Sequence, residues 1–534
     1  MILQKSAIAA ALALSLLPCC AASAASPASN SAVTTAVTYT GTEIQFSDSG
    51  ITSAASDGVE IDGTALTIKE SGTYLLSGTC ADGSIKVKKG TTGVTLVLSG
   101  LTLTSETTAP IICAKSTEVS IVAAVNTENT LTDTENNNAD TGGAEAENAV
   151  IKCKDGSAVT LCGTGTLNVI ANGKNGIKSG ASTESEGDAS LTIRELTLNI
   201  TAPVNDAVNA EAALNVESGT LTIAAGDDAL HCDNTMNIGT ESTAGPSITI
   251  TTCCEGLEGA AVNIYSGDVN ITATDDCINA ANPSLSGYSD TLNISGGTVV
   301  AYTTSGDGFD SNGDITISGG TVAVWTANAA DNSPLDADGT VTISGGTVLA
   351  AGGSGGMGMN LSAQQPCVTF GSTSGMMGGK GSGMGGQKQP SDMQNLDGQN
   401  IEKPDTQNMP GQDFGGFGSA ASLMAENTAF SILDDQGNTL YSGIARCGTS
   451  FLLFSSPELS EGDSCTLSAD GTDTTADVQA GTISSGMGGG MGFHGGSRPD
   501  NGNFFPGGMG GQRPDWNFDS NGNGGKSTEN AQAK

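Results

Sequence analysis

The sequence predicts an all-β fold, a parallel β-helix, from its composition and from an internal repeat. Glycine supplies 76 of the 534 residues and aromatic residues only 4%. Long helices are not expected, because glycine costs a helix about 1 kcal/mol per position relative to alanine. The segment Ile-Ser-Gly-Gly-Thr-Val follows Asn293, Thr316 and Thr342, which are 23 and 26 residues apart. Such a period is typical of repeat proteins.

Each copy of the repeat has the pattern of two short strands around a glycine turn. In Ile315-Thr-Ile317 and Val322-Ala-Val324 the apolar residues occupy every second position. One such unit cannot bury its apolar stripe alone, but stacked units can. The sequence lacks the leucine and asparagine frame of leucine-rich repeats, and calcium-binding nonapeptide rolls have a much shorter period. Residues 50–360 are therefore predicted to form one solenoid.

The N-terminus has the pattern of a secretory signal peptide, residues 1–24. Lys5 precedes the apolar run 7–17, and Ala22-Ser23-Ala24 offers a cleavage site. Lipidation at Cys19 or Cys20 is an alternative, although Pro18 is an unfavourable neighbour. No other apolar run is long enough to span a membrane. We expect a secreted, extracellular protein, released or associated with the cell surface.

The remaining segments differ in composition. Residues 25–49 are expected to be an N-terminal linker, 361–418 a Gly/Met/Gln-rich low-complexity segment and 485–534 a disordered Gly-rich tail, since such sequences lack apolar surface to offset the entropy of ordering. Residues 419–484 regain strand patterns around a turn at Asp435–Asn438. They predict a small β unit, either a cap on the solenoid or a separate module.

The charge excludes several partners. Acidic residues number 57 and basic residues 19, giving a net charge of −38 without a basic cluster. Binding to nucleic acid or to an anionic membrane surface is therefore not expected. No Cys-x-x-Cys pair occurs among the cysteines, which argues against a zinc site. The cysteine pairing stays open, with Cys447–Cys465 as the first pair to test. We expect a monomer.

Acidic residues recur at one position of the repeat. The turns that align are Asn205-Asp-Ala-Val, Asp227-Asp-Ala-Leu, Cys254-Glu-Gly-Leu, Asp275-Asp-Cys-Ile and Gly306-Asp-Gly-Phe. A first column is therefore predicted to contain Asp206, Asp228, Glu255, Asp276 and Asp307. A second column is predicted to contain Asn209, His231, Glu258, Asn279, Asp310 and Asp336.

Carboxylates about one strand spacing apart repel one another, and a bound cation would relieve that repulsion. Calcium is the expected cofactor, because it takes about six to eight oxygen ligands in flexible geometry. The alternative is a solvated acidic face that binds no metal. The candidate ligands are Asp206, Asp227, Asp228, Glu255, Glu258, Asp275, Asp276, Asp307, Asp310 and Asp336.

Catalysis is less favoured than binding. Residues 195–379 contain no Lys or Arg and 20 acidic residues, so a lyase would lack its usual base there. Asp227-Asp228 with His231 imitates part of a polygalacturonase site, but the pair recurs at Asp275-Asp276, as architecture would. No catalytic residue is assigned, and a calcium-dependent lyase or hydrolase remains the alternative.

Two aromatic residues suggest a ligand platform. Tyr302 and Trp325 follow alternating strands at equivalent positions, and alternation is expected to turn both rings outward. Aromatic faces beside polar groups suit sugar rings. The alternative is that the rings cover a corner of the fold.

The sequence resembles secreted bacterial carbohydrate-binding β-helix proteins, which are similar to pectate lyases in fold. The resemblance rests on Gly72-Thr-Tyr-Leu-Leu-Ser-Gly, Gly173-Lys-Asn-Gly-Ile-Lys-Ser, the acidic turns and the Ile-Ser-Gly-Gly-Thr-Val copies. It implies a right-handed parallel β-helix, calcium in the acidic turns, and binding of acidic sugars or cellulose without cleavage. A structural surface protein or adhesin without a sugar ligand is a further alternative.

Overall fold

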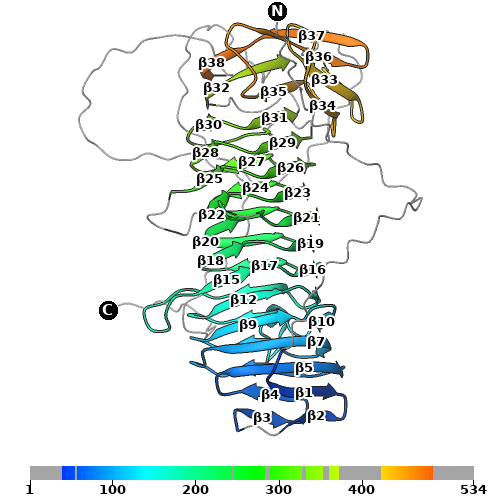
Figure 1. The fold of residues 1–534 in the computed structure, drawn as a ribbon, viewed down its shortest axis with the longest axis vertical. Helices are drawn as coiled ribbons and strands as arrows, with labels where there is room; N and C mark the ends of the chain where they lie inside the picture. Colours follow the sequence, from blue (N-terminus) through cyan, green and yellow to red (C-terminus); the bar gives the residue numbers. More distant parts are fainter. Residues whose placement is uncertain are drawn as a thin grey trace, which may run out of the picture. The chain divides into compact units, whose positions relative to one another are not determined.

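The regular secondary structure of the described part of the chain is almost entirely β-strand. The computed structural model describes residues 39–54, 57–242, 244–282, 285, 289–327, 332–352, 360–371 and 422–484, which belong to one compact unit. These residues form 38 strands and one short 3₁₀ helix, Ala139–Thr141, with no α-helix among them (Figure 1). The described residues include no helix that is long and apolar enough to span a membrane. The all-β prediction is confirmed, whereas residues 1–38, 372–421 and 485–534 lie outside the described part.

Most strands belong to a large sheet in which parallel pairing dominates. From β8 (Ile111–Cys113) to β17 (Val208–Ala210), each strand pairs with the strand three further along the chain. For example, β13 (Thr166–Ile170) pairs in parallel with β16 (Thr197–Ala202), and β16 pairs with β19 (Thr220–Ala225). The chain therefore returns to the same row of strands once per repeat, and three rows result.

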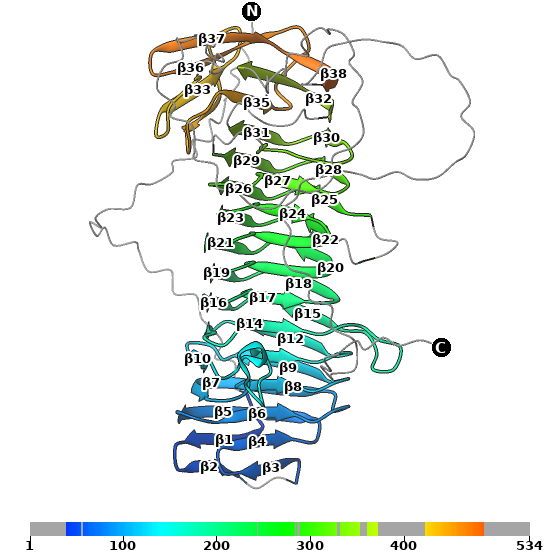
Figure 2. The same cartoon turned by 180° about the vertical axis from the view of Figure 1, so that it is seen from behind.

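Within each of the three rows the strands follow one another in chain order along the stack (Figures 1 and 2). The first row contains β4 (Ala65–Ile68), β6 (Ser84–Val87), β8 (Ile111–Cys113), β11 (Ala149–Cys153), β14 (Asn175–Ser179), β17 (Val208–Ala210), the beginnings of β20 (Leu230–Ile238) and β22 (Leu257–Ile264), β24 (Ile278–Ala280) and β27 (Phe309–Ser311). The second row contains β9 (Glu118–Ala123), β12 (Ala158–Gly163), β15 (Ser190–Ile193), β18 (Ala213–Val216), the ends of β20 and β22, β25 (Thr291–Ile294), β28 (Asp314–Ile317), β30 (Val341–Ile343) and β32 (Asn360–Gly371). The third row contains β10 (Glu128–Asp133), β13, β16, β19, β21 (Ser247–Thr252), β23 (Asp268–Ala273), β26 (Thr298–Thr303), β29 (Thr321–Thr326) and β31 (Thr347–Gly352).

The interior is filled by apolar side chains that stack on the same position of the next repeat. In the second row Leu214, Met236, Val262 and Leu292 are directly paired in register, and all four are fully buried. Each buried side chain of this size stabilises the fold by about 1.5–3 kcal/mol. The alternating pattern of the sequence is therefore the pattern of this continuous core.

The glycine turns join the second row to the third. Gly320 has φ of +80°, a backbone conformation that other residues rarely adopt. At the preceding Gly319, a Cβ atom would lie 2.3 Å from the carbonyl oxygen of Ser295 in the previous repeat. Both glycines are thus required where successive turns stack, which explains the repeated Ser-Gly-Gly-Thr segment.

The N-terminal end of the stack begins earlier than the sequence predicted. β1 (Thr42–Ser47) lies in the expected linker 25–49, yet it pairs in parallel with β5 (Gly72–Cys80) and buries Ile44 and Phe46. β5 in turn pairs with β7 (Val94–Ser105), which spans the second and third rows. The hairpin partners β2 (Gly50–Ser53) of β1 and β3 (Val59–Asp62) of β4 are antiparallel, so this end breaks the repeat.

The C-terminal end is closed by antiparallel strands. β32 occupies residues predicted to begin a low-complexity segment, and it pairs with β35 (Phe451–Ser455) and β38 (Gln479–Ser484). β35 also pairs with β31. The intervening strands form a separate four-stranded antiparallel sheet: β34 (Thr439–Ile444), β33 (Ala429–Leu433), β36 (Ser464–Ala469) and β37 (Thr472–Asp477). The small β unit therefore adds two strands to the stack and packs a second sheet against it.

All eleven cysteines after residue 24 are free thiols, and nine of them are buried. Cys447 and Cys465 are among the buried ones and are not bonded to each other. The nine buried cysteines therefore serve as small apolar side chains of the interior.

The prediction that Trp325 belongs to an exposed aromatic platform is wrong. Its ring points away from the interior of the stack, as alternation requires, but it is only 3% exposed because the C-terminal β unit covers it. Phe430 contacts the Trp325 ring edge-to-face, with 5.8 Å between ring centroids. Tyr302 packs partly buried against the same cluster. The sequence did not indicate that residues 422–484 would fold back onto this row.

Replacing Trp325 with alanine should destabilise the protein, since truncating a buried tryptophan leaves a cavity that costs about 3 kcal/mol or more. The measurement is the urea midpoint of the full chain. The exposed third-row residue Thr222 provides the control Thr222→Ala, which should change the midpoint little. An unchanged midpoint for Trp325→Ala would show that the ring is not buried.

Candidate functional site

The acidic turns connect the third row to the first row. In one repeat β19 ends at Ala225, and Asp227 and Asp228 precede β20. Backbone hydrogen bonds stack successive turns: Ala207 donates to the carbonyl of Asp228, and Ala229 donates to that of Glu255, both at 2.9 Å. The local sequence follows from this position, because the small or glycine residue after each acid lies against the next turn.

The five acids of the first column lie in five consecutive turns. The stack continues with Gly256 donating to the carbonyl of Asp276 at 3.0 Å and Cys277 donating to that of Asp307 at 3.2 Å. Asn175 and Ser333 occupy the equivalent positions before and after the acids. The structure therefore brings together the first-column residues Asp206, Asp228, Glu255, Asp276 and Asp307.

The second column runs along the first row of strands, and each of its residues up to Asp310 follows the first-column residue of the same repeat by three positions. The register pairs, in order, Asn209 with His231, His231 with Glu258, Glu258 with Asn279, and Asn279 with Asp310. An isolated parallel bridge between Phe309 and Leu335 brings Asp336 next to Asp310. Lys178 is the neighbour of Asn209 in the preceding repeat.

Hydrogen bonds join the two columns. The Asn209 amide donates to Asp206 Oδ2 at 2.6 Å, and the Asn279 amide donates to Glu255 Oε2 at 3.1 Å. Asparagine donors thus satisfy one carboxylate oxygen without adding a positive charge.

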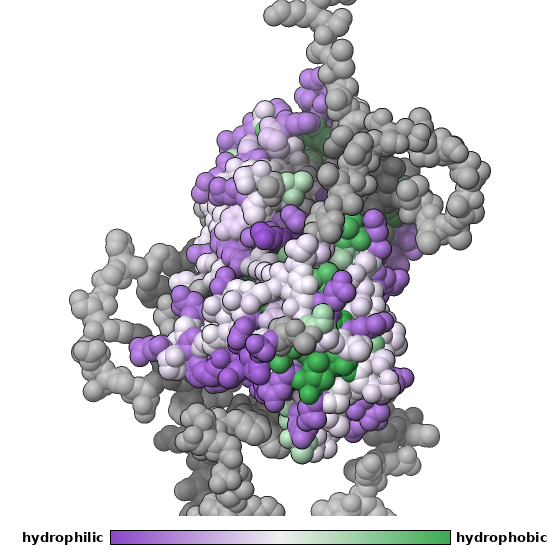
Figure 3. All heavy atoms as spheres, turned by 60° about the horizontal axis from the view of Figure 1, so that its bottom comes forward, coloured by the Kyte–Doolittle hydropathy of each residue, from purple (hydrophilic) through white to green (hydrophobic). Residues whose placement is uncertain are grey.

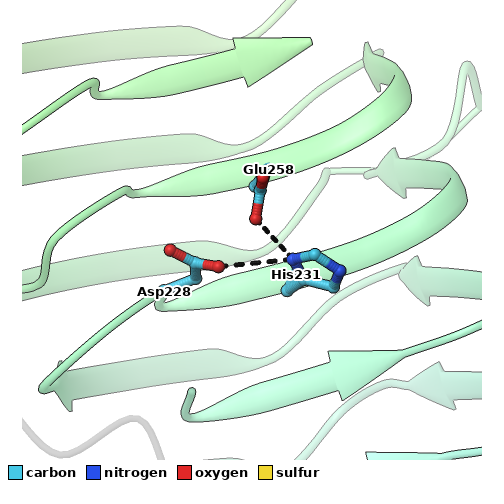
Figure 4. Close-up of side chains that lie close together, drawn as sticks. All are labelled: Asp228, His231 and Glu258. Carbon is cyan, nitrogen blue, oxygen red and sulfur yellow. Dashed lines mark hydrogen bonds and ion pairs between the residues drawn. The ribbon is translucent and has the colours of Figure 1, made fainter. Parts of the chain in front are cut away.

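His231 lies among three carboxylates, two of which, those of Asp228 and Glu258, are drawn with it in Figure 4. Its Nδ1 is 2.5 Å from Glu258 Oε2 and 3.3 Å from Asp228 Oδ2, while Nε2 is 2.9 Å from Asp233 Oδ1. Burial disfavours the imidazolium, but the hydrogen bonds to the three acids outweigh it and raise the pKa of His231. The same imidazolium outweighs burial at Glu258 and lowers the pKa of that carboxyl.

Asp233 is a site residue that the sequence reasoning missed. It is two residues after His231 on the same strand, so alternation places both side chains on the same face. This spacing was the available signal.

The carboxylates of the columns are difficult to ionise together. Burial, followed by the neighbouring charges of Glu258 and Asp228, raises the pKa of Glu255 to about 8. Burial, together with the charge of Asp307, raises the pKa of Asp276 to about 8, and burial raises that of Asp307 to about 7. The pKa values of Asp206, Asp228 and Asp310 are raised to about 6, again mainly by burial. The site therefore holds either protons or another positive charge near neutral pH.

Two buried oxygens in the columns accept no hydrogen bond. Asp228 Oδ1 and Asn279 Oδ1 have no partner within the described residues. Leaving a buried acceptor unpaired costs about 1–3 kcal/mol, so such atoms need a ligand or an ion. A hard cation fits both, because carboxylate and amide oxygens are the donors it prefers.

The potential ligand atoms are close enough for one ion to contact several. Those of Asp206, Asp227 and Asp228 lie within 4.8 Å of one another, and so do those of Asp228, His231 and Glu258. The first group is all oxygen and fits calcium. The second includes an imidazole nitrogen already shared by acids, which fits an internal imidazolium better than a calcium ligand.

The other predicted ligands lie at the rim. Asp275 is exposed, whereas Asp310 and Asp336 are half-buried in the second column. Burial raises the pKa of Asp336 as well. The ten predicted ligands thus follow one strip of the surface, but their burial differs along it.

A family model and a curated relative share one description. Residues 62–356, more than half of the chain, match the family described as carbohydrate-binding domain-containing protein. A carbohydrate-binding domain-containing protein from Acetivibrio thermocellus is 33% identical over 136 residues, which cover 25% of this chain and 47% of that protein. The match thus spans about half the length of that curated relative. A structure of a polysaccharide lyase-like protein from C. thermocellum, in a gadolinium derivative, covers 58% of this chain and 94% of its own, with 25% identity and a TM-score of 0.30.

The metal-free protein should lose stability as the pH rises from 5 to 8. The raised pKa values of Glu255, Asp276 and His231 mean that the folded state binds more protons than the unfolded state in this range, so the free energy of unfolding falls with pH. Melting temperatures in chelator at several pH values measure this.

In the variant Asp276→Asn the side chain cannot ionise, so the melting temperature should fall less between pH 5 and 8. Asp268→Asn, which changes an exposed carboxylate outside the columns, should leave the fall in melting temperature unchanged. A melting temperature that stays constant or rises between pH 5 and 8 would contradict the burial of these acids.

Proposed function

We propose a function from one premise: the chain belongs to the family of carbohydrate-binding domain-containing proteins. It acts as a secreted, calcium-binding and non-catalytic protein that binds polysaccharide. The preferred ligands are acidic sugars such as polygalacturonate, held through bridging calcium, with cellulose as the second class. The observation that carries the calcium part is the pair of unpartnered buried oxygens, Asp228 Oδ1 and Asn279 Oδ1, inside the acidic columns.

We interpret the three rows as the faces of a right-handed parallel β-helix. The support is the pairing of each strand from β8 to β17 with the strand three further on, combined with an apolar interior that runs through the repeats. This arrangement suits a polysaccharide, because equivalent side chains recur along the stack as sugar units recur along the ligand.

Calcium would be held by Asp206, Asp227 and Asp228 in one group, and around Glu255, Asp276 and Asn279 further along the columns. When bound, it supplies positive charge that offsets the buried carboxylates and attracts a uronate carboxylate. The protein's own side chains fix the spacing of that charge, since the backbone register fixes the columns. Without such a charge the acidic strip would repel an acidic glycan.

The non-catalytic role is supported by the state of His231. A histidine that donates from both ring nitrogens to Glu258 and Asp233 has no lone pair with which to accept a proton. Its raised pKa favours that imidazolium form. Residues 195–379 also lack the Lys or Arg that a lyase would use as a base.

Secretion is proposed from the pattern of residues 1–24, where Lys5 precedes an apolar run and small residues follow. Extracellular fluids also provide the calcium concentration that a weak, oxygen-only site requires.

Calcium should raise the melting temperature of the protein. Binding to the folded state alone stabilises it by about 2.7 kcal/mol per site at about a hundred times Kd. The double variant Asp276→Asn, Asp307→Asn should lose the part of this response that comes from calcium around Glu255, Asp276 and Asn279, and Asp268→Asn should keep the whole response. Equal melting temperatures in calcium and chelator, for protein first stripped of metal, would refute the calcium proposal.

Binding to insoluble polygalacturonate should require calcium. A pull-down with the full chain in calcium and in chelator measures retention, and the supernatant is assayed for unsaturated products and new reducing ends. Retention in calcium without product is expected. Product formation would favour the lyase or hydrolase alternative, and absence of retention on any polysaccharide would favour the adhesin.

A further inference from the structure

A polar groove lies at a different corner of the stack from the acidic columns. It has a volume of about 360 Å³ and is formed where β18, β20 and β22 of the second row turn toward the third row. The acidic turns instead lie before the first row. Grooves of this size accommodate small ligands or a few units of a longer one.

Three residues at equivalent positions of successive repeats line the groove. Glu217, Gly239 and Tyr265 directly follow the register-paired residues Val216, Ile238 and Ile264, so they occupy one column in successive repeats. Gly239 and Tyr265 each donate a backbone hydrogen bond to the preceding repeat, at 2.8 and 2.9 Å. Glu217 and Tyr265 are therefore walls about two strand spacings apart, roughly 10 Å. Gly239 adds no side chain between them, and all three residues line the groove.

The glycine is required by the backbone as well. Gly239 has φ of +72°, and a Cβ atom there would lie 2.3 Å from Ser266 Oγ. Any other residue would be strained at this position and would displace Ser266, so the backbone fixes a glycine in the lining of the groove.

A ladder of asparagine amides borders the groove. Asn237 donates to Asn215 Oδ1 at 2.9 Å, Asn263 donates to Asn237 Oδ1 at 3.1 Å, and Asn293 donates to Asn263 Oδ1 at 3.1 Å. Each amide has two N–H donors and two acceptor lone pairs, so one of each remains at every inner step. These groups recur about every 4.8 Å, close to the length of one sugar unit in an extended β-linked glycan.

The charge of the groove selects the class of sugar. Glu217 and Glu241 line it, and no Lys or Arg does. Arg194 lies in the repeat before Glu217, with its guanidinium 4.0 Å from Glu217 Oε2, so its charge is matched there. Hydroxyl groups can donate to these carboxylates in strong hydrogen bonds, whereas a uronate carboxylate would be repelled.

We propose that this groove binds a neutral, hydroxyl-rich β-linked glycan, with one sugar ring stacked on Tyr265 beside Gly239 and its hydroxyls on the Asn215–Asn237 ladder. The inference rests on the proposed polysaccharide-binding function and adds a second site to it. This site needs no calcium, while the acidic columns serve acidic glycans through calcium. Neutral and acidic ligands thus bind at different corners of the stack.

The test measures binding of cellohexaose and of polygalacturonate to the full chain by calorimetry, in calcium and in chelator. Tyr265→Ala should weaken cellohexaose binding about 5- to 100-fold, by analogy with the loss of an aromatic stacking partner, and leave polygalacturonate binding unchanged. Tyr265→Phe keeps the ring and should bind cellohexaose within about threefold of the wild type. Thr222→Ala, an exposed third-row control, should change neither ligand.

Asp276→Asn with Asp307→Asn should show the reverse pattern, with polygalacturonate binding weakened and cellohexaose binding kept. Unchanged cellohexaose affinity in folded Tyr265→Ala, or wild-type protein that binds polygalacturonate but not cellohexaose, would overturn the groove and leave the proposed function standing. Wild-type protein that binds neither ligand would overturn both.

Discussion

The parallel register between equivalent strands is the constraint on which the rest of the structure depends. Once β13 pairs residue for residue with β16, and β16 with β19, every side chain lies over its equivalent in the next repeat, about 4.8 Å away. In the interior this stacks apolar groups on one another and stabilises the fold. On the surface the same register prevents side chains of like charge from moving apart. The acidic columns are the same geometry applied to carboxylates.

Several devices reduce the repulsion in these columns. Asn209 and Asn279 donate hydrogen bonds to carboxylates, and His231 places a positive charge among Asp228, Asp233 and Glu258. The acids further along the stack have no such cation among the described residues, and burial raises the pKa values of Glu255 and Asp276 to about 8. The histidine thus relieves one part of the strip, and the calcium proposal concerns the rest.

Periodicity made much of the structure predictable, and its limits coincide with the ends of the repeat. The alternating strands, the glycine turns and the alignment of Asp228 with Asp276 could be predicted, because each copy carries the same local signal. β1 and β32 could not, because each occurs in a segment without a neighbouring copy. Trp325 was placed on the correct face, but its burial by Phe430 depends on a contact between residues 105 positions apart in the chain. Alternation says nothing of such a contact. The groove lined by Tyr265 likewise lies at a departure from the repeat, a glycine at position 239 where the neighbouring repeats carry Glu217 and Tyr265.

The most direct test of the calcium proposal is a crystal structure of the protein grown in saturating calcium, with anomalous scattering used to locate the ions. The proposal predicts a cation bound to oxygen atoms of the two acidic columns, in contact with Asp228 Oδ1 or Asn279 Oδ1, the two buried acceptors that lack a hydrogen-bond partner among the described residues. Well-ordered columns without any cation, in which water or a side chain donates to both oxygens, would contradict it.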